Sequence, residues 1–159
     1  MQLSKNFTLE EMEKSSTGIR LGIKNKAGSG EIKNLGDIGY EILEPVRIKF
    51  DKPVTITSGY RSPQLSEAIG SKSTSQHCLG EAVDMEVLSV SNLEVALWIQ
   101  NHCSFDQLIL EYYTGEANSG WIHVSYKDGS NRKQVLTFDG KSYTNGLPDA
   151  EWSGGKMSN

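Results

Sequence analysis

Cysteine is scarce in this sequence, because Cys78 and Cys103 are the only two among 159 residues. They are not spaced as C-x-x-C, so we expect reduced thiols rather than a disulfide framework or an all-cysteine metal site. Long apolar runs are missing too, and no stretch approaches the ~20 residues that a membrane span requires. With 36% hydrophobic residues and a mean hydropathy of −0.44, the composition is that of a soluble globular protein. The length fits one domain with its own core.

An excess of positive charge is absent as well. The net charge is −4 and the pI is near 5.4. Because nucleic-acid binding requires a basic surface, we expect no nucleic-acid partner. The first residues lack the charged and apolar regions of a secretory signal. We therefore expect a cytoplasmically synthesised monomer with no membrane partner, which reaches any external target by another export route.

Histidine is also rare, yet two of the three histidines fall in one informative pattern. His77 precedes Asp84 by seven residues, and His123 follows Asp84 by 39 (123 minus 84). Two histidines and one carboxylate form the three-ligand set of a catalytic zinc ion, with the fourth position left for water. The spacing alone also fits ordinary surface or core histidines.

The residues around these three side chains alternate as strands do. In the segment 82–87, Asp84 shares a face with Ala82 and Glu86, and in 121–126 His123 shares a face with Trp121 and Ser125. Gly80 suits a tight reversal between His77 and the first strand. Two strands of one sheet could therefore bring the side chains together.

Three motifs carry a resemblance to a known family. They are Ser75-x-His77-x-x-Gly80-x-Ala82-x-Asp84 followed by Trp121-x-His123, the segment Ser58-Gly59-Tyr60-Arg61-Ser62, and the opening residues 3–12. Together they resemble the M15 family of zinc D-alanyl-D-alanine carboxypeptidases and murein endopeptidases, over roughly residues 3 to 127. The opening segment is typical of a branch found in bacteriophages and prophages. The family shares its fold with the signalling domain of hedgehog proteins.

The resemblance implies a zinc ion bound by His77, Asp84 and His123, and a general base nearby. Better-known members carry an acidic residue three positions before the last histidine, where this sequence has Gly120. We expect Glu111, on a strand next to that of His123, to replace it, with Glu116 as the second choice.

Further residues are expected around the metal. Arg61 matches the family arginine that holds a substrate carbonyl or carboxylate, and it could also stabilise an oxyanion. Trp121 is expected to form a wall of the cleft, and Ser75 and Gln76 to meet substrate. Cys78 is a weaker alternative for a fourth zinc ligand, and Asp106 is expected to cap a turn. A serine-hydrolase motif of the form G-x-S-x-G is lacking.

The order of elements predicts an α+β domain with helices packed on one antiparallel sheet, as in the hedgehog and DD-peptidase fold. We expect a capping box at Thr8–Glu11, a loop over 24–33, and a helix capped by Asn34 in which Pro45 makes a kink or the final turn. A helix from Leu93 to about His102 and a last strand at 134–138 follow. The zinc peptidase domain is expected to span 1–140, and 141–159 to be a polar, partly flexible extension.

The expected function is hydrolysis of amide bonds in peptidoglycan stem peptides or cross-links by a phage endolysin or prophage enzyme, carried to the wall by a holin or a virion. The bond remains open among D-Ala-D-Ala, L-Ala-D-Glu and cross-bridge bonds. Two alternatives are a zinc-binding module without turnover and a virion component whose hydrolysis assists genome entry.

Overall fold

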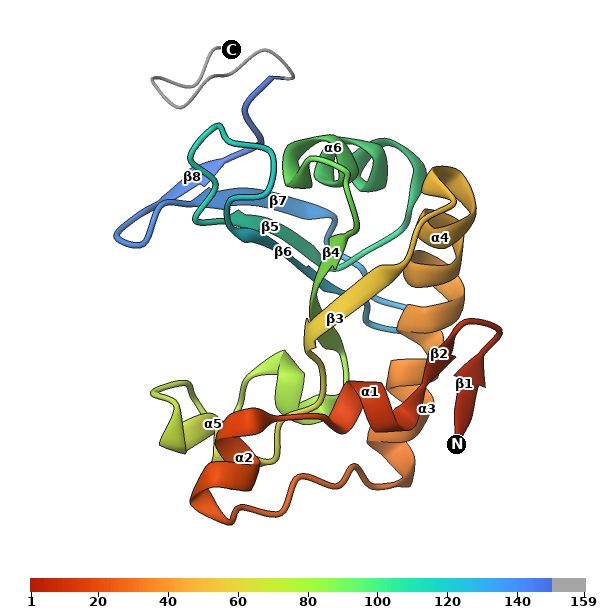
Figure 1. Cartoon of the computed structure of the whole chain (residues 1–159), viewed down its shortest axis with the longest axis vertical. Coiled ribbons are helices and arrows are strands. Elements are labelled where there is room, and N and C mark those ends of the chain that lie inside the picture. The colour runs from red at the N-terminus through yellow and green to blue at the C-terminus, as the bar shows by residue number, and fades with distance from the viewer. Residues whose placement is uncertain (150–159) are drawn as a thin grey trace.

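The computed structural model describes residues 1–149. Its helices are α1 Leu9–Glu13, α2 Ser16–Leu21, α3 Ser29–Ile38, the π-helical η1 Gly39–Leu43, α4 Glu44–Phe50, α5 Pro63–Ala68, the 3-10 turn η2 Gln76–Leu79, and α6 Asn92–His102. Its strands are β1 Gln2–Ser4, β2 Phe7–Thr8, β3 Val54–Ser58, β4 Ala82–Val87, β5 Gln107–Glu111, β6 Trp121–Ser125, β7 Gln134–Phe138, and β8 Tyr143–Asn145. Figure 1 shows their arrangement. The α+β class is confirmed.

A six-stranded sheet in the order β3-β4-β6-β5-β7-β8 forms the centre, and β1 pairs with β2 in a small separate sheet. The prediction of a purely antiparallel sheet is wrong at one pair, because β7 runs parallel to β5. After β6 the chain crosses to the other edge of β5, where the next strand, β7, pairs with β5. Since β6 is antiparallel to β5, a strand that reverses from β6 must run parallel to β5.

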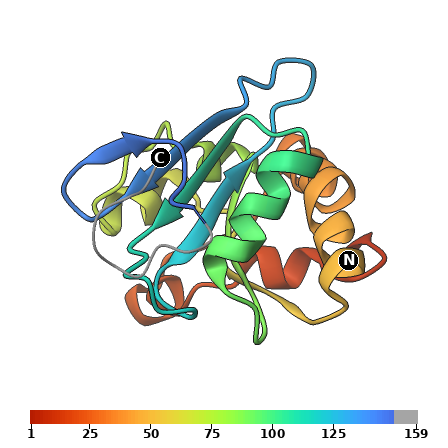
Figure 2. The ribbon, with the colours of Figure 1, turned by 90° about the horizontal axis from the view of Figure 1, so that it is seen from above.

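The two faces of the sheet differ. One face carries apolar residues such as Met85, Leu110 and Val124, which belong to a single core cluster with residues of α3, η1, α4 and α6. Figure 2 shows α6 lying over the sheet. The alternate residues of the same strands, Asp84 and His123 among them, point to the other face. The predicted alternation of β4 and β6 is therefore confirmed, and it separates the core from the polar face.

The long helical segment begins earlier than expected. Helix α3 starts after Gly28 as N-cap, inside the predicted loop, and the Glu31 carboxylate accepts from the Gly28 N–H at 3.0 Å. Asn34 does not cap the helix, because its amide donates to the Leu79 carbonyl at 2.8 Å. A glycine N-cap offers no side-chain oxygen, so the sequence pattern favoured Asn34 instead.

Pro45 neither ends the helical segment nor breaks it. The π-helical turn η1 comes just before it, and the Glu44 N–H reaches back to the Gly39 carbonyl. Proline has no N–H and its ring would meet the carbonyl four residues earlier in a regular helix. The wider π turn accommodates the ring, and the helical path continues to Phe50.

Other predicted elements agree with the structure. Thr8 and Glu11 form both hydrogen bonds of the capping box, and Ser91 caps α6. Strand β8 was not predicted. It lies within the expected polar extension and pairs with β7, while residues 150–159 of that extension lie outside the described residues. No helix of the described chain is long and apolar enough to cross a membrane.

Candidate metal centre and catalytic cleft

Three side chains predicted from the sequence meet on the polar face of the sheet. Asp84 on β4 and His123 on β6 are direct cross-strand neighbours, and His77 comes from η2. One ligand atom from each of the three lies within 4.8 Å of the others. Asp84 Oδ1 is 3.1 Å from His123 Nδ1 and 3.5 Å from His77 Nε2. Two imidazoles and a carboxylate, all largely buried, form a group that could hold a metal ion.

Gly80 makes the approach of His77 to β4 possible. Its φ of +72° is in the left-handed region, and a Cβ there would lie 2.4 Å from the Glu31 carbonyl oxygen. Only glycine fits this position without displacing α3. At the other end of η2, the Ser75 hydroxyl accepts from the His77 N–H at 3.2 Å. The expected tight reversal at Gly80 is confirmed, and Ser75 serves to position the turn.

The hydrogen bond of His77 fixes its tautomer. Its Nδ1 donates to the Gly59 carbonyl oxygen at 2.8 Å, because a carbonyl can only accept. Burial lowers the pKa of His77, so the ring is neutral near pH 7. Its Nε2 therefore presents a lone pair to the Asp84 carboxylate. Two acceptors face each other at this point, and a cation between them would satisfy both.

Asp84 remains ionised in this position. Burial alone would raise its pKa, but the hydrogen bond with the neighbouring His123 imidazole outweighs that effect and holds the pKa well below its ordinary value. Arg61 adds a further favourable contact, with Nη2 donating to Asp84 Oδ2 at 3.3 Å. The site thus keeps a negative charge where a metal ligand requires one.

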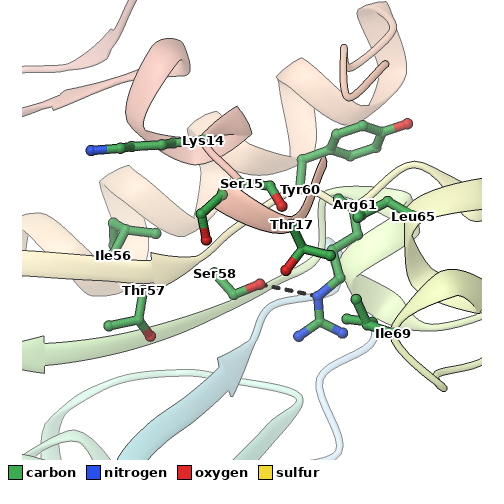
Figure 3. A pocket seen from close by; sticks show the side chains of 11 residues that line it. Lys14, Ser15, Thr17, Ile56, Thr57, Ser58, Tyr60, Arg61, Leu65 and Ile69 are labelled. Atoms are coloured by element: carbon green, nitrogen blue, oxygen red, sulfur yellow. Dashed lines mark hydrogen bonds between the residues drawn. The ribbon is translucent and has the colours of Figure 1, made fainter. Parts of the chain in front are cut away.

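Arg61 stands at the edge of this group. Its Nε donates to the Ser58 hydroxyl at 3.0 Å (Figure 3), and the Arg61 side chain is 14% exposed. It lines a cavity of about 490 Å³ together with the three candidate metal ligands and Glu111. The structure therefore places Arg61 beside the metal group, as the sequence predicted.

Glu111, the expected base, lies at the end of β5 beside Trp121 of β6. Trp121 Nε1 donates to Glu111 Oε2 at 3.0 Å, and both residues line the same cavity. Burial raises the pKa of Glu111, and the charge of Asp84 raises it further. A carboxylate with a raised pKa beside a metal group accepts a proton more readily than an ordinary glutamate.

Gly120 explains why the acidic group is not at the usual position. Its φ is +67°, and a Cβ built there would lie 1.9 Å from the Glu111 carbonyl oxygen. The backbone path of this chain therefore leaves no room for a side chain three residues before His123. Glu116, the second choice for the base, is exposed in the loop between β5 and β6 and is not among the residues that line the cavity.

The remaining candidates lie elsewhere. Gln76 donates to Asp106 Oδ2 at 3.0 Å, and its side chain is not part of the cavity wall. Asp106 is buried rather than capping an exposed turn, and it also accepts from the Arg132 guanidinium at 2.9 Å. The Cys78 thiol is 3.9 Å from the Lys72 carbonyl and outside the metal group.

Two tyrosines of the cleft were missed by sequence reasoning. Tyr112 and Tyr143 both line the cavity of the metal group. Tyr143 lies on the unpredicted strand β8, in a segment whose polar composition hid it. Tyr112 directly follows Glu111 but turns to the cleft because its φ is +58°, which period-two alternation does not anticipate.

One comparison with known proteins identifies a relationship. The sequence model of a family described as Peptidase M15 matches residues 5–125, which is most of the chain and includes the three candidate metal ligands, Arg61 and Glu111. No curated protein matches the chain.

Proposed function

The chain belongs to the peptidase M15 family, and from this premise we propose that it is a zinc-dependent peptidase. Its substrates would be amide bonds of peptidoglycan stem peptides or their cross-links. The observation that carries the proposal is the pair of facing acceptors, His77 Nε2 and Asp84 Oδ1, 3.5 Å apart. A neutral imidazole and a carboxylate in that arrangement need a cation, and nitrogen donors favour zinc over magnesium or calcium.

Each residue of the cleft has a role in the proposed hydrolysis. His77, Asp84 and His123 would hold the zinc ion. When bound, zinc lowers the pKa of water and polarises a carbonyl. Glu111 accepts the proton of the attacking water and returns it to the leaving amine, so that one amide bond breaks and one carboxyl and one amine form. Arg61 binds the carbonyl oxygen as negative charge develops there.

The main alternative is a zinc-binding module without turnover. A half-buried carboxylate with a raised pKa and an arginine in the same cavity favour an enzyme, because neither is needed to hold the metal. A virion component that hydrolyses peptidoglycan during genome entry would use the same site.

The experiment is a digest of purified peptidoglycan followed by mass spectrometry of the muropeptides. We expect zinc-dependent release of fragments, stopped by phenanthroline and restored by added zinc. His77→Ala should lose both zinc and activity. His102→Ala is the matched control, because His102 stacks on Trp98 at the end of α6 and is not part of the metal group. Full zinc occupancy without any product would support the inert module instead.

We also propose that the protein is made in the cytoplasm of a phage-infected or prophage-carrying cell and reaches the wall after release. Expression alone should then leave cells intact, while co-expression with a holin should cause lysis. Lysis of equal extent without the holin would contradict this route.

A further inference from the structure

A second cavity adjoins the metal cleft on the far side of Arg61. It has a volume of about 320 Å³ and shares Arg61 and Ile69 with the cleft. Figure 3 shows the Thr17 and Ser58 side chains beside the Arg61 side chain. The cleft therefore does not end at the arginine, and space for a bound chain continues beyond it.

The lining of this second cavity, which we call the hydroxyl pocket, is rich in alcohols. They are Ser15, Ser16, Thr17, Thr57 and Ser58. A hydroxyl can both donate and accept, so such a wall matches the alternating N–H and C=O groups of a peptide. Ile56 and Leu65 add apolar surface. Lys14 and Arg61 are the charged residues of its lining, so the hydroxyl pocket suits a stretch of peptide without basic side chains.

The opposite end of the cleft is aromatic. Trp121, Glu111, Phe138 and Tyr143 are successive cross-strand neighbours on β6, β5, β7 and β8. Phe138 stacks on Tyr143 with ring centroids 4.4 Å apart, and Tyr112 stacks on Trp121 at 5.0 Å. Tyr112 and Tyr143 remain 45% and 58% exposed. We call Trp121, Tyr112, Phe138 and Tyr143 the aromatic row.

The residue Tyr112 is held in an unfavourable backbone conformation. Its φ of +58° is rare for a non-glycine residue, and such strain is often kept at functional positions. Gly140 leaves room for the ring, since a Cβ there would lie 2.8 Å from Tyr112 Cε1. Both features keep Tyr112 in the aromatic row beside the cleft.

The two ends lie on opposite sides of the metal group. The hydroxyl pocket includes residues of β3, the metal group lies on β4 and β6, and the aromatic row ends on β8. Five strand spacings separate β3 from β8, or roughly 24 Å at ~4.8 Å each. A peptide needs about seven extended residues to cross that width.

We propose that the cleft binds peptide on both sides of the metal group, in the hydroxyl pocket and on the aromatic row, and that the protein is an endopeptidase. A carboxypeptidase needs a cation that closes the cleft against the terminal carboxylate. Arg61 is the sole Lys or Arg among the residues lining the metal cavity within the described chain, and the cavity continues past it. This inference rests on the proposed peptidase function and specifies its substrate.

The first test compares two substrates by mass spectrometry of their products. These are a cross-linked muropeptide dimer and the uncross-linked pentapeptide monomer, each with the zinc-loaded protein. Water adds across an internal amide bond, so no product should be a free amino acid released from the C-terminus of a stem. Release of single terminal amino acids alone would overturn the inference while leaving the peptidase function intact. If neither substrate is cut, the proposed function fails, and the inference fails with it.

The second test fills the hydroxyl pocket. Thr17→Trp, or Thr57→Trp from the opposite wall, should raise KM for the dimer by about tenfold, which corresponds to ~1.4 kcal/mol of lost binding. Zinc content and kcat should stay near the wild-type values. Ile19→Trp on the same helix α2 is the control, because Ile19 is 80% exposed and is not among the residues of the hydroxyl pocket. An unchanged KM in both folded pocket variants would overturn the assignment of this subsite.

The third test removes the far end of the aromatic row. Tyr143→Ala should raise KM for the dimer with kcat preserved, whereas the exposed neighbour Thr144 faces the other side of β8 and Thr144→Ala should behave like the wild type. Equal KM values for Tyr143→Ala and the wild type would remove the aromatic row from the inference. A glycan-free dimer distinguishes the occupant, because a loss seen only with glycan-linked substrate would show that the aromatic row binds sugar.

Discussion

At the scale of single residues, the meeting of the three candidate metal ligands could be predicted because their chemistry and their strand positions agree. The positions of Asp84 and His123 followed from the alternation of two strands, and the position of His77 followed from the turn at Gly80. Ser75 and Gln76 were expected at the substrate, yet Ser75 caps η2 and Gln76 bonds Asp106, 30 residues away. Hydrogen bonds between distant segments leave no local pattern, and sequence periodicity cannot reveal them.

Glu111 carries the sharpest prediction at this scale. Glu111→Gln keeps the shape of the side chain but removes the basic carboxylate, so zinc binding and folding should survive. Turnover of peptidoglycan should fall by roughly 10²–10⁴, the usual contribution of a general base. Glu116→Gln is the matched control and should remain active, because Glu116 is exposed outside the cleft. The reverse result would make the loop glutamate the base.

At the scale of elements, local signals located most helices and strands but not their exceptions. The π-helical turn before Pro45 and the Gly28 cap of α3 both depend on backbone geometry that side-chain patterns do not encode. The parallel pair β5 and β7 depends on where the chain goes after β6, which is a question of topology rather than propensity.

The loop between β5 and β6 should tolerate no side chain at Gly120. We expect Gly120→Ala to lower the free energy of unfolding by more than ~2 kcal/mol, since the methyl group would meet the Glu111 carbonyl in addition to the left-handed strain of ~1–2 kcal/mol. Gly129→Ala isolates the strain alone, because Gly129 has φ of +79° with nothing within 4 Å of its Cβ position. Urea denaturation measures both. Equal losses in the two variants would disprove the steric argument.

The loop before β7 depends on Asp106. Its carboxylate accepts from the backbone N–H and the guanidinium of Arg132, and these bonds, with that from Gln76, lower its pKa below the ordinary 3.8 even though burial opposes them. A lowered folded-state pKa gives stability that is present above about pH 3.8 and is lost as pH falls through the folded value.

Asp106→Asn should therefore cost roughly 1–3 kcal/mol of unfolding free energy at pH 7, as expected for hydrogen bonds to a charged group. The difference from wild type should shrink below pH 3.8. Asp128→Asn, in the loop before β7, is the control, because its exposed ion pair with Lys33 is screened by solvent and should contribute little. Denaturant titrations at pH 7 and at low pH would test this, and a pH-independent difference would contradict it.

At the scale of the whole molecule, one face of the sheet builds the core and the other builds the cleft. The sequence predicted this division through alternating residues in β4 and β6. It did not predict how wide the polar face is, because β8 and its Tyr143 lie in a polar segment where composition indicated an extension. The core is separate from the metal group, so the fold should persist without metal.

Removal and return of the metal tests that separation. Ligands from η2, β4 and β6 meet only in the folded chain, so zinc binding should stabilise it. At a free zinc concentration of about 100 times Kd the gain is ~2.7 kcal/mol. For a domain of this length that corresponds to roughly 5–11 °C in Tm, measured by calorimetry with and without chelator. Magnesium should give no shift, because imidazole donors do not suit it.

His102→Ala should show the full zinc shift and His77→Ala none, while both unfold cooperatively without metal. A similar shift in His77→Ala would place the zinc elsewhere, and an apo protein without a cooperative transition would mean that the metal holds the fold itself.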